Sequence, residues 1–265
     1  MRKSTINLIK SIFRKFDIEV IKLSSLQRLQ EKLEENQVDS FDLSFLMSLP
    51  NHHAPLILQN IKNSKSQIRQ DLFVLSELGF KKNGFFVEFG ATNGLDFSNT
   101  YLLEKIYNWS GILAEPAKCW HSTITKNRSA YIENKCVWSS SNLILPFNEV
   151  SMPGLSTINL YSNEDLHSET RKNGKIYNVE TISLNDLLLK YNAPTNIDYL
   201  SIDTEGSEFD ILSNLDFDKY TFKVITCEHN YTPMRKRIFD LLTKNGYIRK
   251  FEALSKFDDW YVKVK

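Results

Sequence analysis

Several features are missing from this sequence, and each absence excludes a class of protein. No run of about eighteen apolar residues is present, so the chain offers no candidate for a membrane-spanning helix. The net charge of +1 gives no basic field suited to nucleic acid. The three cysteines, Cys119, Cys136 and Cys227, are odd in number and have no CxxC spacing, which argues against a disulfide framework and structural zinc. A cytoplasmic protein is therefore expected.

The first part of the chain lacks glycine altogether. Residues 1–66 are rich in Lys, Glu, Gln and Leu at helical spacing, which predicts one or two helices. The start, MRKSTINLIKSIF, has no long apolar stretch and no small-residue cleavage site, so it does not fit a signal peptide. We interpret residues 1–65 as a helical N-terminal extension and residues 66–265 as the main domain, with His52 and His53 in a surface loop between helices and domain.

A basic face on the first predicted helix has two interpretations. The favoured one is a solvated face on a helix that packs through its other side. The alternative is peripheral contact with an anionic surface at the inner face of the membrane. The residues concerned are Arg2, Lys3, Lys10, Arg14 and Lys15.

What the chain does contain suits a large core, because 42% of its residues are hydrophobic and 12% aromatic. The stretch from Gly84 to Lys105 is the most informative. Its apolar residues 85–89 predict a strand buried on both faces, as in a parallel sheet. Gly90 and Gly94 then bracket a loop that can turn sharply and approach a ligand, and an amphipathic helix begins near Ser98 or Asn99, with Ile106 on its apolar side. The order is typical of a nucleotide-like site.

Strands and helices alternate around this stretch. SGILAEP predicts a second strand ending in Glu115, and AYIENKCVW a third strand, followed by a polar loop at residues 139–142 that could border an adenine. Residues 143–179 have no helical period and are interpreted as an insertion with short strands. Ser183 with Asp186 resembles a helix N-cap. Later strands end at Asp203 and at residues 228–230, and two final strands form a closing antiparallel hairpin.

The strand ends predict an acidic crevice. In an open α/β sheet the ligand lies at the carboxyl ends of the strands, so Glu88, Glu115, Asp203, Glu205 and Glu228 should converge there. Such acids repel a pyrophosphate and favour a cationic ligand. S-adenosylmethionine, a sulfonium with an adenosine and an amino-acid end, meets this requirement. Glu115 is the expected ribose ligand, since its distance from Glu88 resembles the usual gap between a glycine loop and a ribose-binding acid.

These residues carry a family resemblance. VEFGATNGLDFSNTYLLEK, ILAEP, DYLSIDTEGSEFDIL, EHN and DDWYV resemble the FkbM family of S-adenosylmethionine-dependent methyltransferases, over residues from about 66 to the end. The resemblance implies a class I methyltransferase (Rossmann-like) fold: a seven-stranded sheet, helices on both faces and one antiparallel strand near an edge. It also implies O-methylation, often of sugars or natural products. The residues expected to bind the cofactor are Glu88, Gly90, Ala91, Asn93, Gly94, Asn99, Glu115, Pro116, Asp203 and Glu205.

Methyl transfer to oxygen requires alignment and removal of the hydroxyl proton. His229 is the first candidate base, because its ordinary pKa suits neutral-pH proton transfer, with Asp203 and Glu228 beside it. The alternative is a divalent cation such as Mg²⁺, held by Asp203, Glu228 and Asn230, that acidifies the hydroxyl. In a further alternative, Asp203 and Glu205 cap the helix that follows them and bind the amine of the cofactor, without a metal.

The predicted function is O-methylation of a sugar hydroxyl in a polysaccharide, glycolipid or related glycan precursor. One alternative is a nicotinamide-dependent oxidoreductase, which the acidic crevice and the closing hairpin disfavour. A non-catalytic adapter on the same fold, binding a partner through its N-terminal helices, is the other. The expected partners are a small-molecule or glycan substrate and no nucleic acid, and an oligomer is compatible with the sequence.

Overall fold

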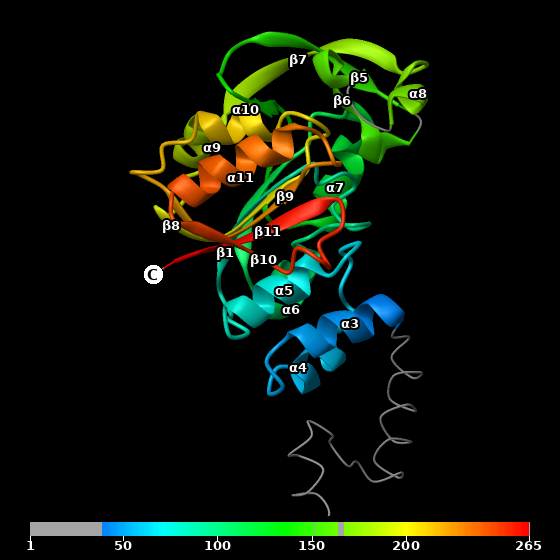
Figure 1. Ribbon diagram of the computed structural model, residues 1–265. Coiled ribbons are helices and arrows are strands. Elements are labelled where there is room, and N and C mark those ends of the chain that lie inside the picture. Colours follow the sequence, from blue (N-terminus) through cyan, green and yellow to red (C-terminus); the bar gives the residue numbers. More distant parts are fainter. Residues whose placement is uncertain (1–38, 151, 164–166, 265) are drawn as a thin grey trace, which may run out of the picture. The chain divides into compact units, whose positions relative to one another are not determined.

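The computed structural model describes residues 39–150, 152–163 and 167–264 (Figure 1). The chain divides into two compact units, Met1–Leu43 and Ser44–Lys265, and the site lies entirely in the second. The helices predicted before residue 39, with their basic face, lie outside the described residues. Within the described part, no helix combines the length and the apolar character needed to cross a membrane.

The central sheet has seven strands in the order β10-β11-β9-β8-β1-β2-β3. Neighbouring strands from β9 to β3 pair in parallel, whereas β11 is antiparallel to both β9 and β10. This arrangement confirms the predicted class I sheet with its closing hairpin. The strands are β1 (Phe85–Phe89), β2 (Ser110–Ala114), β3 (Tyr131–Glu133), β8 (Asn196–Ile202), β9 (Thr221–Glu228), β10 (Tyr247–Lys250) and β11 (Asp258–Lys263).

Helices cover both faces of this sheet (Figure 1). One face carries α5 (Gln70–Glu77) and α6 (Tyr101–Tyr107), and the other carries α9 (Leu184–Lys190), α10 (Glu208–Ser213) and α11 (Met234–Lys244). Two further helices, α3 (Ser40–Ser48) and α4 (Ala54–Asn60), precede them, and α7 (His121–Asn127) follows β2. Trp260 in β11 is fully buried and stacks on Phe73 of α5, with ring centroids 4.7 Å apart.

The predicted insertion folds as a second, four-stranded sheet in the order β4-β7-β5-β6. Its elements are β4 (Cys136–Trp138), β5 (Ile144–Glu149), β6 (Thr157–Ile158), α8 (Ser168–Arg171) and β7 (Lys175–Ser183). The single third strand predicted from AYIENKCVW is therefore wrong: residues 131–133 join the central sheet, and residues 136–138 pair with β7. The backbone amide of Lys135 donates to Glu133 Oε1, which turns the chain between the two sheets. Ser183 caps α9 as predicted, accepting a hydrogen bond from the Asp186 amide.

Helix α6 begins later than predicted, at Tyr101. Ser98 and Asn99 lie before the helix, where they donate hydrogen bonds to the Glu88 carboxylate, as described below. The apolar side also differs, since Ile106 is 52% exposed while Tyr107 is buried. The helix therefore packs through Leu102, Leu103 and Tyr107.

Candidate active site

A cavity of about 590 Å³ opens at the carboxyl ends of β1, β8 and β9. It brings together the glycine loop and the acids predicted from separate strand ends. The predicted site residues that line it are Glu88, Gly90, Asn93, Asn99, Asp203, Glu205, Glu228 and Asn230. A smaller pocket of about 40 Å³ adjoins it and contains Glu115 and Pro116, together with Cys136 and Val137 of β4. Residues 139–142, expected beside an adenine, line neither cavity.

The two glycines of the loop are required by contacts within the protein. Gly90 has a φ of +72°, and a Cβ at this position would lie 1.9 Å from the backbone oxygen of Asp203. Gly94 has a φ of +76°, and its Cβ would lie 2.7 Å from Arg128 Cγ. The glycine loop therefore packs directly on the end of β8 and on Arg128, which fixes its position at the cavity.

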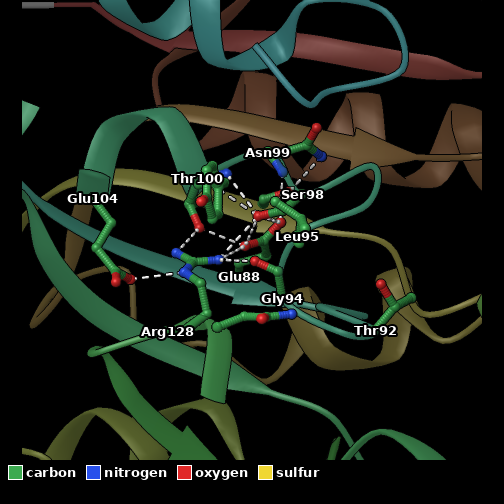
Figure 2. Close-up of polar contacts among 12 residues, drawn as sticks. Glu88, Thr92, Gly94, Leu95, Ser98, Asn99, Thr100, Glu104 and Arg128 are labelled. Carbon is green, nitrogen blue, oxygen red and sulfur yellow. Dashed lines mark hydrogen bonds and ion pairs between the residues drawn. The ribbon is translucent and has the colours of Figure 1, made fainter. Parts of the chain in front are cut away.

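Glu88 holds the start of α6 against the glycine loop (Figure 2). Its carboxylate accepts hydrogen bonds from the Asn99 amide at 2.7 Å and from the hydroxyls of Ser98 and Thr100. Arg128 lies 3.6 Å from the same carboxylate. Because both carboxylate oxygens of Glu88 already have partners in the protein, this residue fixes the loop and the start of the helix. Its charge is not available to a ligand.

Arg128 is fully buried and binds several parts of this region at once (Figure 2). Its guanidinium donates to Glu104 Oε2 at 2.8 Å, to Thr100 Oγ1 at 2.8 Å and to the Gly94 carbonyl at 3.2 Å. It thus connects α6, the end of α7 and the glycine loop, and it compensates the charge of the buried carboxylates.

Asn99 presents an unsatisfied acceptor in the cavity wall. Its side-chain nitrogen donates to Ser201 Oγ at 3.0 Å, whereas Oδ1 is buried and has no hydrogen-bond partner within the described residues. A buried polar atom without a partner is costly, so Asn99 Oδ1 is a position where a ligand donor would be favourable. Asn93 instead binds within its own loop, accepting from the Leu95 and Asp96 amides, and Ala91 is buried outside the cavity lining.

Glu115 lies at the end of β2 as predicted, in the smaller pocket. Its two carboxylate oxygens accept hydrogen bonds from the backbone amides of Thr92 and Ala117, each at 2.8 Å. Burial raises the pKa of Glu115 to about 8, and these two hydrogen bonds oppose the increase. The carboxyl retains lone pairs that could accept hydroxyl groups.

The raised pKa of Glu115 predicts a pH dependence of stability. Its pKa is 4.5 ordinarily and about 8 in the folded chain, so the folded state holds the proton more tightly than the unfolded state. Its contribution to stability is full below about pH 4.5 and is lost as the pH rises to about 8. We expect urea denaturation of Glu115→Gln to show a smaller loss of stability over this interval than the wild-type chain. Parallel curves for the two proteins would contradict the prediction.

Three carboxylates, from Asp203, Glu205 and Glu228, approach within 4.8 Å of one another in the main cavity. Burial raises the pKa of Asp203 to about 7, and burial together with the Asp203 charge raises the pKa of Glu228 well above its ordinary value. Glu228 Oε2 is buried and has no hydrogen-bond partner in the described part of the chain. The three residues are called the acid cluster below.

Glu205 is the member of the acid cluster that is already paired. Arg171, at the end of α8, donates to Glu205 Oε2 at 2.7 Å and to the Leu155 carbonyl at 2.8 Å. Asn230 donates to the same Glu205 oxygen at 3.1 Å. The fully buried side chain of Arg171, in α8, therefore compensates the charge of Glu205. Asp203 and Glu228 remain as the carboxyls that share a proton.

His229 follows Glu228 but lies outside the lining of the main cavity. Its Nδ1 accepts a hydrogen bond from the Tyr231 amide at 3.0 Å, and its Nε2 lies 3.7 Å from Asp259 Oδ1. Burial lowers the pKa of the imidazole. This geometry directs the ring toward β11, so a carboxyl of the acid cluster is better placed to take a proton from a ligand in the cavity.

Four of the thirteen non-glycine residues with a positive φ in the described part of the chain line the cavity. Thr92, Phe97, Glu205 and Asn230 all line it, and all have a positive φ, at +47°, +60°, +58° and +42° respectively. Non-glycine residues in this region cost free energy and cluster at functional sites.

Some residues of the site are not predicted by the sequence. Arg128 and Arg171 are ordinary charged residues in the sequence, and nothing in their spacing indicates that they are buried. Trp120 lines the cavity with a buried indole nitrogen that has no partner among the described residues. Phe97 was recognisable only as part of the loop. His167, which the sequence offers as a substrate contact or a surface residue of the insertion, lines the cavity.

The fold and the site together define a class I methyltransferase. The sequence pattern of the methyltransferase FkbM domain matches residues 88–249, and the chain belongs to this family of S-adenosylmethionine-dependent methyltransferases. The chain matches none of the curated proteins.

Solved structures that are similar to this chain at low sequence identity include the following two. Precorrin-6y C5,15-methyltransferase from Geobacter metallireducens GS-15 is 10% identical, with 73% of this chain and 88% of that chain covered and a TM-score of 0.40. A variant of MtNAS in complex with S-adenosylmethionine is 14% identical, with 99% of this chain and 79% of that chain covered and a TM-score of 0.34. The family assignment rests on the domain match.

Proposed function

We propose that this protein transfers the methyl group of S-adenosylmethionine to a sugar hydroxyl of a polysaccharide, a glycolipid or a related glycan precursor. The observation that carries the proposal is the unpartnered oxygen of Glu228, in a cavity that also contains the glycine loop. This oxygen can accept the proton of a hydroxyl as it attacks the methyl carbon. Acids in the cavity also suit a sulfonium better than a phosphate-rich dinucleotide.

The cofactor spans the two adjoining cavities in this proposal. The smaller pocket receives the ribose edge of the adenosine, with Glu115 on the ribose hydroxyls and Pro116 beside it. The methionine end lies along residues 90–94 in the larger cavity, where Asn99 Oδ1 accepts from the ammonium group. This placement directs the sulfonium methyl toward Asp203 and Glu228.

Proton removal is assigned to Glu228, with Asp203 as its coupled partner. Burial and the Asp203 charge raise the pKa of Glu228, whereas the hydrogen bond from Glu228 lowers the pKa of Asp203, so Glu228 holds the shared proton. Glu228 passes this proton to Asp203 as its Oε2 accepts the proton of the acceptor hydroxyl. His229, the base predicted from sequence, is the alternative, because it follows Glu228 directly. We expect His229→Gln to retain most of the activity, measured as the rate of S-adenosylhomocysteine formation, because both ring nitrogens face groups of the protein. A loss comparable to that of a Glu228 variant would restore the histidine as the base.

A divalent cation is the second candidate for activating the hydroxyl. The acid cluster supplies oxygen ligands of the kind Mg²⁺ prefers, and Glu228 Oε2 is uncommitted. Asp203 and Glu228 would hold the ion, with Glu205 or Asn230 as the third protein ligand. A bound cation would lower the pKa of the acceptor hydroxyl. Removal of metal with EDTA, followed by addition of MgCl₂, tests this role.

The same proposal includes the division of the chain into domains and the location of the protein in the cell. Residues 66–265 form the catalytic domain in this proposal, and residues 1–65 precede it as an extension. The protein works in the cytoplasm, and contact with the inner face of the membrane, where glycan precursors are assembled, is the alternative.

Calorimetry with S-adenosylhomocysteine and with NAD separates the methyltransferase from the oxidoreductase. We expect heat of binding with S-adenosylhomocysteine and none with NAD, because the acid cluster repels a pyrophosphate. Binding of NAD alone would overturn the proposal.

The sugar acceptor is tested by comparing glycan hydrolysates. Cells with the wild-type protein should yield a methyl ether of a sugar, detected by mass spectrometry, that cells with the Glu228→Gln variant lack. Identical hydrolysates with a methylated non-sugar product would correct the acceptor class. A non-catalytic adapter would give no methylated product while its cellular function persists in the variant.

A further inference from the structure

One hydrogen-bond donor of the main cavity has no part in the proposed reaction. Three residues of the cavity lining carry a buried side-chain atom that has no hydrogen-bond partner in the described part of the chain: Asn99, Trp120 and Glu228. The proposed reaction uses the oxygens of Asn99 and Glu228 as acceptors. The third atom, Nε1 of Trp120, can only donate. A ligand that satisfies all three atoms therefore presents an acceptor to Trp120.

The indole of Trp120 is held in place by the second sheet. The residue ends a short 3₁₀ helix, Lys118–Trp120, and its backbone amide donates to the Ala117 carbonyl at 3.1 Å. Its ring packs against the apolar core of the second sheet, which includes Phe147 and Ile158. A buried tryptophan N–H usually has a hydrogen-bond partner. Because the ring is committed to this packing, the partner expected for Nε1 is a group that enters the cavity.

The wall that contains Trp120 supplies none of the proposed cofactor contacts. Met152 and Leu155, from the segment between β5 and β6, line the larger cavity together with Trp120. All three are absent from the lining of the smaller pocket, where Glu115 binds the ribose. The methionine end lies along the glycine loop, at residues 90–94. The second-sheet wall is therefore left for the methyl acceptor.

From this placement we infer that Trp120 is a specificity-determining residue, whose indole N–H donates a hydrogen bond to a second oxygen of the methyl acceptor. Glu228 accepts the proton of the hydroxyl that is methylated. A sugar ring carries further hydroxyls and a ring oxygen, each of which can accept a hydrogen bond. Two contacts of opposite kind then orient the ring so that one hydroxyl faces the sulfonium methyl. The inference rests on the proposed function and adds to it the residue that selects the acceptor.

The test follows the indole N–H signals of the full-length protein by NMR. The chain has four tryptophans, and two of them already have acceptors: Trp109 donates to the Lys81 carbonyl at 2.8 Å and Trp260 to Asp258 Oδ2 at 3.1 Å. The Trp120 signal is the one absent from Trp120→Phe. The probes are the methyl α-glycosides of glucose, galactose and mannose, added to protein saturated with S-adenosylhomocysteine. We expect at least one probe to move the Trp120 signal downfield, as a new hydrogen bond does, and to leave the signals of Trp109 and Trp260 in place.

The Trp120→Phe variant keeps an aromatic ring against the second sheet but removes the donor. Its affinity for the probe should fall about three- to tenfold, the effect of one neutral hydrogen bond, while its calorimetric affinity for S-adenosylhomocysteine stays unchanged. Trp138→Phe is the matched control, because Trp138 packs against the same core but lines neither cavity. If Trp120→Phe fails to fold, phenylalanine variants of the other three tryptophans identify the Trp120 signal, and the wild-type spectrum remains the test.

Two results would overturn the inference with the proposed function intact. One is binding of a glycoside that leaves the Trp120 signal in place, or that is weakened equally by Trp120→Phe and Trp138→Phe. The other is a downfield shift of the Trp120 signal with S-adenosylhomocysteine alone, which would assign the N–H to the cofactor. A wild-type protein that binds no glycoside, or no S-adenosylhomocysteine, would instead count against the proposed function, and the inference would fall with it.

Discussion

Replacing Glu228 by glutamine is expected to lower the rate of methyl transfer by about 10²- to 10⁴-fold, the range for loss of a general base. The amide keeps the size of the side chain but cannot take a proton from the acceptor hydroxyl. S-adenosylhomocysteine should still bind, because the adenosine pocket and the glycine loop do not depend on Glu228. The measurements are the single-turnover rate and calorimetric affinity for S-adenosylhomocysteine.

Glu133→Gln is the matched control for this substitution. Glu133 is also a buried glutamate at the end of a strand of the central sheet, but it pairs with Lys190 and lines neither cavity. Its variant should lose stability and keep the rate of methyl transfer per folded molecule. An active Glu228→Gln variant would assign proton removal to another group or to the solvent.

The sequence was informative wherever a local pattern determined the structure. Apolar strands followed by acids, with Gly90 and Gly94 between strand and helix, were sufficient to predict the central sheet and the edge at which the site lies. The carboxyl ends of parallel strands meet at one edge, so residues far apart in sequence could be placed together. By the same reasoning the sequence predicts that the carboxylates of Asp203, Glu205 and Glu228 lie close together, as they do.

The sequence was uninformative where the structure depends on non-local partners. Arg171 reaches Glu205 only because the second sheet folds beside the end of β8, and Arg128 is buried only because buried carboxylates surround it. The insertion gave no helical period, and its strands pair with residues 136–138, which the sequence assigned to the central sheet. The tautomer and orientation of His229 follow from the Tyr231 amide and from Asp259, neither of which a motif reveals.

Substituting Arg128 by methionine is expected to destabilise the protein by about 3–5 kcal/mol, the usual cost of removing one partner of a buried ion pair. Methionine fills part of the space but leaves Glu104 and Glu88 without their common cation, and the Gly94 carbonyl loses a donor. Because the same residue holds the glycine loop, affinity for S-adenosylhomocysteine should fall as well. Urea denaturation and calorimetry measure the two effects.

The control for Arg128 is Arg235→Met, at an arginine that is 28% exposed and pairs with Asp259 away from the glycine loop. Solvent compensates such a pair, so its loss should cost less, and cofactor affinity should stay unchanged. Adding Glu104→Gln to Arg128→Met should recover part of the stability, because it removes a charge that has lost the Arg128 guanidinium and keeps only Lys105 as an ionic partner. Recovery of stability without recovery of S-adenosylhomocysteine affinity would show that Arg128 fixes the loop through Gly94 and not only through charge balance. A loss below about 1 kcal/mol in the single variant would mean that the guanidinium and its carboxylates are compensated by solvent, contrary to their burial.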